Sequence, residues 1–425
     1  MTALPLLAAA SLGVFIFPAA RAQTPPTLTT LYAFQAKDDS PTGRVLGAGS
    51  ALYGTTLATV FTLDPPASAG GAWTETALQN VELPTGIAFG PKGEIYGMTI
   101  EGGGAPACPN GCGTVFALTP PASPGRPWAK HVLYTFTGDG DGAFPTGAPV
   151  IGRDGTLYGT TQYGGAVAGC SGIVPGCGTV FALTPPASPG EPWTETLPYI
   201  FRGGGDGYNP GGGLVIDENG NLYGTTPFGG EYLKGAVFEL IPPVSAGGAW
   251  TKAVIYSFTG KDGDGYQPSS GLVAGKDGVL YGATALGGIA DGGMVFALYP
   301  PASAGAWTER VLYRFEVQGG LLPVPNGDLA IGKDGAIFGT TAHGGIFAPL
   351  CSDGCGLVFG LYPPSAGGAW TAKVLYSFGG GSDGAGPLGG LAIGPEGGLY
   401  GATAYGGDLS CKPPIGCGTA FQLVP

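Results

Sequence analysis

The chain has 425 residues, of which 11% are charged and 44% are hydrophobic, and its formal net charge is −12. Nucleic-acid binding relies on basic patches that neutralise phosphates, and no such patch is visible here. The composition therefore excludes nucleic acid as a partner and argues against an anionic membrane surface. The 85 glycines and 40 prolines fall at regular places, which argues against a disordered chain.

The first segment is typical of an export signal. Residues 4–20 are nearly all apolar or small, and Ala20-Arg21-Ala22 fits a small-x-small cleavage site. No Lys or Arg precedes the apolar stretch, so an N-terminal membrane anchor is the alternative. We predict a signal peptide at residues 1–22, a mature chain without a transmembrane segment, and a secreted protein that is extracellular or periplasmic.

The next element, residues 27–34, has the pattern that marks the end of each unit in the rest of the chain, as in residues 311–315. No other strands of a unit precede it, and the last unit stops after its third strand. We therefore expect the N-terminal strand to complete the last unit. Such closure removes an exposed sheet edge.

A repeated fragment organises everything that follows. It reads D-G-x-L-Y-G-T-T, G-G, G-T-V-F-x-L, P-P, W-T and L-Y-x-F, and it occurs seven times. The Tyr-Gly positions are 43 to 65 residues apart, at Tyr53, Tyr96, Tyr158, Tyr223, Tyr281, Phe338 and Tyr400. A period near this length in units made only of strand-like segments favours a β-propeller. We predict one all-β domain at residues 23–425, a seven-bladed β-propeller of four-stranded antiparallel blades.

One unit shows the expected strands. They lie at residues 213–217, 221–226, 236–240 and 250–258, separated by an Asn-Gly hairpin, a Gly-rich loop and a Pro-Pro turn. Because the strands alternate in direction, the two short turns share one face, and the long variable connections share the other. Function usually lies on variable loops over a rigid scaffold, so we expect this second face to be the working one.

The eight cysteines fall as four local pairs within these variable connections, and an even number in an exported chain predicts disulfides. Zinc is the alternative, but His131 and His343 are the only histidines and do not accompany the pairs. We therefore predict disulfides between near neighbours and no metal. The pairs are Cys108/Cys112, Cys170/Cys177, Cys351/Cys355 and Cys411/Cys417.

The crossovers between units contain Asp-Gly segments such as G-D-G-D-G at residues 138–142 and K-D-G-D-G at residues 261–265. Calcium needs six to eight oxygen ligands, and these segments supply two carboxylates each without a terminal Glu. Asp-Gly turn chemistry is the simpler interpretation, with calcium as the alternative.

Aromatic residues lie beside these acidic groups. Tyr163, Phe228, His343 and Tyr405 occupy one variable position before Gly-Gly, and Phe144, Tyr208 and Tyr266 lie on the crossovers. Such a face suits stacking on sugar rings. The alternative is that these aromatic rings cap the blades as part of the core.

Catalysis has little support in the sequence. Of the segments that lead into the inner strands, only residues 325–328 bring a carboxylate, that of Asp328, and His343 is a lone candidate base. We therefore predict no catalytic residue and no cofactor.

The first unit is abbreviated on the working face, because residues 53–60 join its second and third strands with almost no loop. We expect a notch there, with Glu101, Asp328 and Tyr405 near the opening. The candidate ligand-binding residues are Glu101, Tyr163, Phe228, Asp328, His343 and Tyr405.

At these motifs the chain resembles the GloVer (Gloeo/Verruco) tandem-repeat family of exported bacterial proteins. The resemblance covers essentially the whole mature chain, and its inner hairpins are also similar, more loosely, to the NHL-type propeller repeat. The motifs that carry it are L-Y-G-T-T at 157–161, G-G at 164–165, G-T-V-F at 178–181, W-T at 193–194 and I-Y-S-F at 255–258. The resemblance implies an exported or surface protein and no established reaction.

We therefore hypothesise a secreted, non-catalytic propeller whose disulfide-stapled loop face binds a glycan or a surface protein. One alternative is an exported carbohydrate-active enzyme, a hydrolase or lyase, that uses Asp328, His343 and loop carboxylates. The other is a structural component of the cell envelope.

Overall fold

The computed structural model describes residues 25–425, except residues 69, 124–125, 168, 171–173, 189, 246, 269, 304, 317–321 and 366–367. The predicted signal peptide at residues 1–22 lies outside this part of the chain and stays a prediction. No helix in the described ranges is long and apolar enough to cross a membrane.

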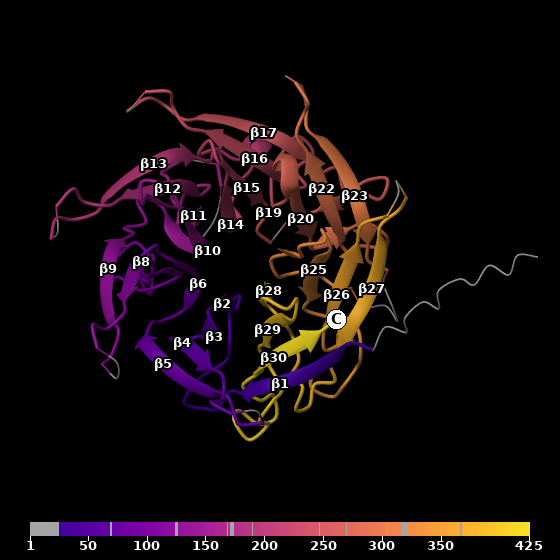
Figure 1. Cartoon of the computed structure of the whole chain (residues 1–425). Coiled ribbons are helices and arrows are strands. Elements are labelled where there is room, and N and C mark those ends of the chain that lie inside the picture. The colour runs from indigo at the N-terminus through magenta and orange to yellow at the C-terminus, as the bar shows by residue number, and fades with distance from the viewer. Residues whose placement is uncertain are drawn as a thin grey trace, which may run out of the picture.

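Seven four-stranded antiparallel sheets surround a central axis and form a β-propeller, so the predicted fold is confirmed (Figure 1). Blades 1 to 3 are β2 (Leu46–Ala48) to β5 (Thr74–Asn80), β6 (Pro84–Phe89) to β9 (Ala129–Thr135), and β10 (Ala143–Ile151) to β13 (Thr194–Ile200). Between their ends lie β3 (Ala51–Thr55), β4 (Thr59–Asp64), β7 (Ile95–Thr99), β8 (Thr114–Thr119), β11 (Leu157–Tyr163) and β12 (Thr179–Thr184).

Blades 4 to 6 are β14 (Gly211–Ile216) to β17 (Thr251–Ser257), β19 (Val273–Ala274) to β23 (Thr308–Arg314), and β24 (Ala330–Ile331) to β27 (Thr371–Ser377). They contain β15 (Leu222–Thr226), β16 (Ala236–Ile241), β20 (Leu280–Thr284), β22 (Met294–Tyr299), β25 (Ile337–Thr341) and β26 (Leu357–Tyr362). A separate hairpin pairs β18 (Gly265–Tyr266) with β21 (Leu286–Gly287).

Blade 7 combines the two ends of the chain. Its inner strands are β28 (Ala392–Ile393), β29 (Leu399–Thr403) and β30 (Thr419–Val424), and its outer strand is β1 (Thr27–Ala33). The antiparallel pairing of β1 with β30 runs from Thr27 opposite Val424 to Ala33 opposite Thr419. In Figure 1 the indigo strand β1 lies beside the yellow strand β30. The predicted closure by the N-terminal strand is therefore present.

Phenylalanine rings join consecutive blades. A Phe at the end of one blade's outer strand packs edge-on against the Phe of the next blade's third strand, with ring centroids 5.1 Å apart for Phe136 and Phe181. The third-strand ring in turn lies over the Gly of the Tyr-Gly motif. A Cβ on Gly159 would lie 2.5 Å from the Phe181 ring, so only glycine fits there. This packing explains why Tyr-Gly and V-F recur together.

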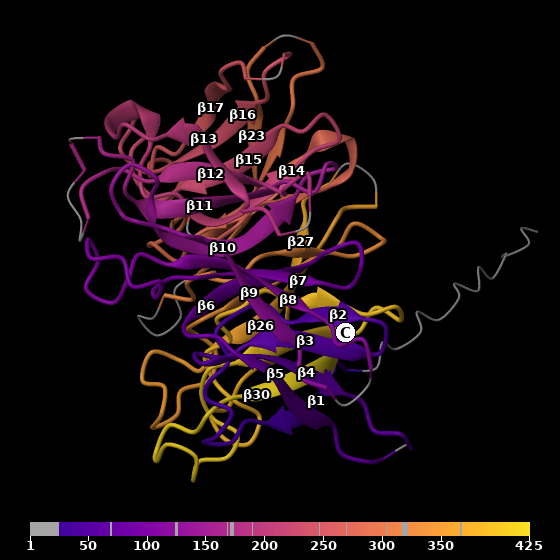
Figure 2. The same cartoon turned by 90° about the vertical axis from the view of Figure 1, so that its left-hand side faces the viewer.

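The connections separate onto two faces, as expected for antiparallel strands. The turn face carries the short turns between strands 1 and 2 and between strands 3 and 4 of each blade. The loop face carries the connections between strands 2 and 3 and the crossovers to the next blade. In Figure 2 the C-terminus lies toward one side of the ring, and the yellow loop between β29 and β30 extends from the other.

Candidate functional site

The disulfides lie on the loop face and pair near neighbours, as predicted: Cys108–Cys112, Cys170–Cys177, Cys351–Cys355 and Cys411–Cys417. We call the four connections that hold them, in blades 2, 3, 6 and 7, the stapled loops. The disulfides also pack against the crossovers. A Cβ on Gly138 would lie 2.5 Å from the sulfur of Cys112, so the crossover glycine lets the backbone approach the disulfide.

The crossover aspartates act as caps within their own segments. The Asp141 carboxylate accepts hydrogen bonds from the Tyr134 hydroxyl at 2.9 Å, from the amide and hydroxyl of Thr137 at 2.8 Å each, and from the Gly138 amide at 3.2 Å. Asp264 accepts a similar set from Tyr256 and Thr259. These contacts support the turn interpretation of the Asp-Gly segments. The described residues contain no group of three or more Asp, Glu, His or Cys that could hold a metal ion.

Three crossover aspartates, Asp38, Asp141 and Asp264, also face a half-buried glutamate on the outer strand of the next blade. Burial raises the pKa of Glu195 to about 7, and the negative charge of Asp141 adds to the shift. Glu75 beside Asp38 and Glu309 beside Asp264 have pKa values raised to about 7, again mainly by burial. These carboxyl groups are therefore partly protonated near neutral pH.

Blade 4 has a lysine at the same position. The Lys252 ammonium lies 2.6 Å from the Asp206 carboxylate and pairs with it. Burial lowers the pKa of Lys252, and the hydrogen bond and charge of Asp206 oppose that shift. The residue after Trp-Thr on the outer strand thus determines the partner of the crossover aspartate, which is a glutamate in blade 3 and a lysine in blade 4.

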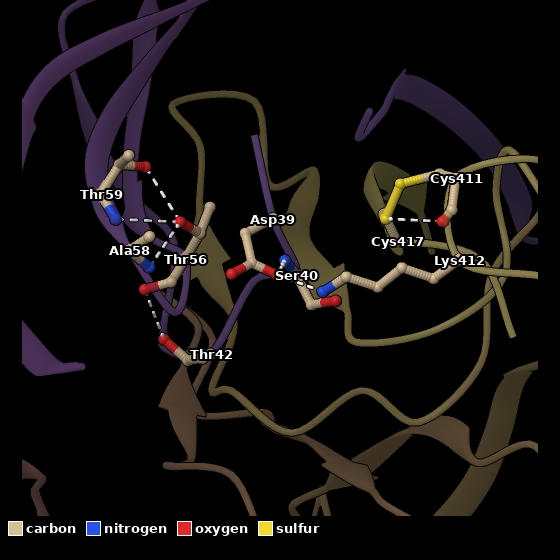
Figure 3. A network of polar contacts seen from close by, with 9 residues as sticks. All are labelled: Asp39, Ser40, Thr42, Thr56, Ala58, Thr59, Cys411, Lys412 and Cys417. Atoms are coloured by element: carbon tan, nitrogen blue, oxygen red, sulfur yellow. Dashed lines mark hydrogen bonds and ion pairs between the residues drawn. A yellow bond between two sulfur atoms is a disulfide. The ribbon is translucent and has the colours of Figure 1, made fainter. Parts of the chain in front are cut away.

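The ring closure has its own contact on the loop face (Figure 3). Asp39, in the crossover from β1 to β2, forms an ion pair with Lys412, which follows Cys411 in the stapled loop of blade 7. In the same view, the short loop of blade 1 closes on the Thr56 hydroxyl, which accepts hydrogen bonds from the Ala58 and Thr59 amides at 3.2 and 3.0 Å. This turn keeps the first loop short.

Backbone walls the central channel. Its cavity of about 190 Å³ is bordered by all seven blades, and many of its lining residues are glycines. A Cβ on Gly147 would lie 2.6 Å from the Gly213 amide nitrogen, so the inner strands are in backbone contact. Arg44 and Asp328 are the charged residues in its wall. Asp328 accepts a hydrogen bond from the Gly271 amide at 2.9 Å.

A shallow hollow of about 320 Å³ opens beside the short loop of blade 1 and shares part of its lining with the channel. Leu57, Leu83 and Ile100 give it apolar walls. A hollow is thus present beside the abbreviated loop, where the sequence predicted a notch. Of the three residues expected at the opening, Asp328 lines the adjoining channel, whereas Glu101 and Tyr405 line neither cavity.

Large apolar side chains are exposed mainly on the loop face. Of the sixteen that are exposed in the described part of the chain, ten lie in connections between strands 2 and 3. They are Leu57, Phe228, Tyr232, Leu233, Ile289, Ile346, Phe347, Tyr405, Leu409 and Ile415. We call these ten side chains the apolar rim.

The sequence assigns this molecule to a family. Residues 56–245 and 169–421 match the Gloeobacter/Verrucomicrobia repeat model. The chain belongs to the Gloeobacter/Verrucomicrobia repeat family. This confirms the resemblance found in the sequence motifs. A search of curated proteins finds no match.

Solved structures share the fold of this Gloeobacter/Verrucomicrobia repeat protein at low identity. A fungal alcohol oxidase of the AA5 family, in complex with copper, has a TM-score of 0.54 and 13% identity, over 93% of this chain and 75% of that one. The extracellular domain of a protein described as a putative one-component system of B. thetaiotaomicron has a TM-score of 0.52 and 10% identity, over 93% of this chain and 39% of that one. PQQ-bound aldose sugar dehydrogenase from Streptomyces coelicolor has a TM-score of 0.44 and 16% identity, over 75% of this chain and 92% of that one. At these identities the likeness shows the propeller fold alone.

The six predicted ligand-binding residues of the repeat protein are spread around the ring. Glu101 accepts a hydrogen bond from the Asn110 side chain at 3.0 Å within the loop of blade 2. Tyr163 packs edge-on against Phe144, and Phe228 stacks on Tyr208 with ring centroids 5.4 Å apart.

His343 is exposed, and its backbone carbonyl accepts a hydrogen bond from Thr341. Tyr405 is also exposed, and its backbone pairs with Ala385. The polar groups of Asp328, His343 and Glu101 thus have separate surroundings, and their role in ligand binding stays a prediction.

Two features of the Gloeobacter/Verrucomicrobia repeat protein were missed in the sequence. Arg44 follows Pro41-Thr42-Gly43, which matches the Pro-Thr-Gly segment at residues 145–147 within β10, the inner strand of blade 3. Aligning that segment with the others would have placed Arg44 in the channel wall. The half-buried glutamates could have been found from the motif Trp-Thr-Glu. This motif places an acidic residue on the outer strand, opposite a hydrophobic residue of the third strand, as Glu195 lies opposite Leu183.

Proposed function

We propose that this protein is exported and non-catalytic, and that it binds a surface partner through its loop face. The apolar rim is the observation that carries the proposal. Exposed apolar side chains that gather on one face of a soluble protein mark interaction sites more often than scattered ones do. Of the sixteen exposed large apolar side chains in the described residues, ten lie here, five of them in the stapled loops of blades 6 and 7.

The stapled loops suit such a role. Each disulfide restrains a short segment, so the side chains beside it lose little conformational freedom when a partner binds. Ile346 and Phe347 lie just before the Cys351–Cys355 disulfide, and Leu409 and Ile415 flank Cys411. Four disulfides also favour an oxidising compartment outside the cytoplasm, which supports export.

The composition of the rim favours a protein partner. Six of its ten side chains are Leu or Ile. Aliphatic side chains form the buried core of protein interfaces, whereas sugars are held by flat aromatic faces and planar polar groups. The net charge of −12 further favours a partner whose facing surface is basic.

A glycan is the second candidate, and one contact favours it. Phe228 stacks on Tyr208 with an interplanar angle of 22°, and the Phe228 side chain is 38% exposed. An aromatic ring that is held from behind and open in front can stack on a sugar ring.

The channel supports binding without catalysis. Its charged lining groups, Arg44 and Asp328, come from blades 1 and 6, and the Asp328 carboxylate accepts a hydrogen bond from a backbone amide. General acid–base chemistry instead needs a group free to reach the proton it transfers. Paired acids, as in glycoside hydrolysis, would have to come from the loops.

Binding of the purified chain to isolated envelopes of the producing cells tests this proposal. A protein partner predicts saturable binding that is lost after protease treatment of the envelopes, and a glycan array together with periodate treatment tests the second candidate. Turnover on a panel of polysaccharides and lactones would contradict the non-catalytic part. Binding that survives both treatments, or no saturable binding, would contradict the surface partner.

A further inference from the structure

The turn face carries a second pattern, which concerns tryptophan. Each of blades 1 to 6 has a Trp one residue before its outer strand, and they are Trp73, Trp128, Trp193, Trp250, Trp307 and Trp370. In blades 3 to 6 the indole packs against the Tyr of the Tyr-Gly motif in the preceding blade. Trp193 lies 6.1 Å from Tyr96, and Trp250 lies 5.9 Å from Tyr158, both edge-on between ring centroids. Trp307 and Trp370 make the same contact, and Trp73 and Trp128 lie in the same hydrophobic clusters as the corresponding tyrosines, Tyr400 and Tyr53.

Blade 7 lacks the indole because its outer strand comes from the N-terminus. Thr27 pairs with Val424 in the same register in which Thr194 pairs with Thr184. The residue before Thr27 is Pro26, so proline occupies the place of the seventh tryptophan. The aromatic partner in the preceding blade is nevertheless retained, as Phe338.

A cavity of about 970 Å³ lies at this position. Its lining includes Pro26, Phe338 and Tyr362, and the last two form an edge-on aromatic pair with centroids 6.1 Å apart. Val374 of β27 and Ile393 of β28 add apolar wall. A second cavity of about 900 Å³ lies on the other side of the first hairpin of blade 7. Ile393 lines both cavities, and Trp73 is part of the wall of the second one.

We propose that the cavity between blades 6 and 7 is a binding site for a planar aromatic ring, which takes the place of the missing indole. Four equivalent junctions show that this packing geometry accommodates an indole edge-on against a ring at the position of Phe338. Burying an aromatic ring in such a site gains hydrophobic energy and an additional edge-to-face contribution. The ring can belong to a free aromatic molecule or to a Trp side chain of a peptide.

The site lies on the turn face and involves none of the ten side chains of the apolar rim. The inference therefore does not depend on the proposed function, and the two can fail separately.

Titration of the full chain with indole, followed by ligand-observed NMR and calorimetry, tests the site. Pro26→Trp restores the repeat pattern and should fill the cavity. It should weaken indole binding by at least about tenfold and raise the melting temperature. Thr27→Trp is the control, because the next residue of a strand points to the opposite face. It should bind indole within about twofold of the native chain.

A second pair of variants tests the site independently, in case Pro26→Trp does not fold. Val374→Trp fills the same cavity from β27, and it should also weaken indole binding. Val254→Trp places the same side chain at the equivalent position of β17 in blade 4, away from the cavity, and should not.

The two sources of the ring are separated with the peptide Gly-Gly-Ala-Trp-Thr, copied from residues 70–74. A peptide that binds more tightly than indole indicates a polypeptide ligand, and indole that binds as tightly or more tightly indicates a small molecule. The proposal is overturned if the native chain does not bind indole or the peptide at millimolar concentrations. It is equally overturned if the cavity-filling variants bind as the native chain does.

Discussion

At the residue scale, the most informative groups are the acidic pairs between blades. Glu75, Glu195 and Glu309 each face a crossover aspartate that is already hydrogen-bonded to a tyrosine. Burial, followed by the negative charge of the facing aspartate, raises the pKa of each half-buried glutamate, so the folded chain favours the protonated carboxyl. The stability of the propeller should therefore depend on pH.

The direction of this dependence follows from the raised pKa values. Each glutamate has a folded-state pKa of about 7 and an ordinary value of 4.5. Its contribution to stability is fully present below pH 4.5 and is lost as the pH rises through 7. We expect the melting temperature to fall between pH 5 and pH 8, by the equivalent of roughly 1–2 kcal/mol per glutamate after solvent screening.

Glu195→Gln tests the assignment, because the amide is neutral at every pH. The variant should be more stable than the native chain at pH 8, should differ little at pH 5, and should lose about a third of the pH dependence. Glu218→Gln, in an exposed hairpin turn, is the control. A pH dependence that is unchanged in Glu195→Gln would show that other groups cause it.

At the element scale, the stapled loops are local additions to a scaffold that forms without them. Blades 1, 4 and 5 have no disulfide yet have the same four strands as the others. The cysteines of each pair are four to seven residues apart, so each bridge closes a short segment. The disulfides thus fix the shape of the loop face more than they hold the ring together.

Replacing both Cys170 and Cys177 by serine should reveal this division. Closing so short a loop stabilises by about 2–3 kcal/mol at most, so the variant should fold with a modestly lower melting temperature. Hydrogen exchange should increase in residues 164–167 and 174–178 and in the adjoining crossover, where Gly203 packs against the Cys170 sulfur. Increased exchange in the strands of distant blades would contradict a local role.

At the scale of the whole molecule, the pairing of β1 with β30 closes the ring. Without β1, blade 7 would expose the edge of β30, and Phe34 would no longer pack on Phe61 of blade 1. Both changes affect the junction between the last and first blades, where Asp39 and Lys412 also pair.

Deletion of residues 23–35 should therefore cost several kcal/mol, a large part of a typical stability of about 5–15 kcal/mol. Urea denaturation of the full and shortened chains measures the difference. A shortened chain that unfolds at the same urea concentration would show that β1 contributes little to closure.

The fold could be predicted from the sequence because its period is carried by residues with packing reasons. Tyr-Gly and V-F recur since the Phe181 ring requires a glycine beneath it, and the same holds in every blade. The disulfide pairs could be predicted because both cysteines lie in one loop.

The site was less predictable, since it depends on which blades differ. The cavity beside Phe338 lies where Pro26 takes the place of the Trp found in the other blades, and Arg44 lines the channel after a segment that contains no other charged residue. The spacing of the motifs also gave no measure of exposure, so the apolar rim emerged only with the structure.

The most direct test of the central claim compares two exposed apolar sites on opposite faces. Ile346→Ser with Phe347→Ser removes rim side chains beside a stapled loop, and Val244→Ser with Ile241→Ser removes similar area from the turn face. Binding of each variant to envelopes of the producing cells is the measurement. The proposed function predicts that the rim variant loses at least about tenfold in affinity while the turn-face variant binds like the native chain. Equal binding by both variants, or a loss confined to the turn-face variant, would contradict it.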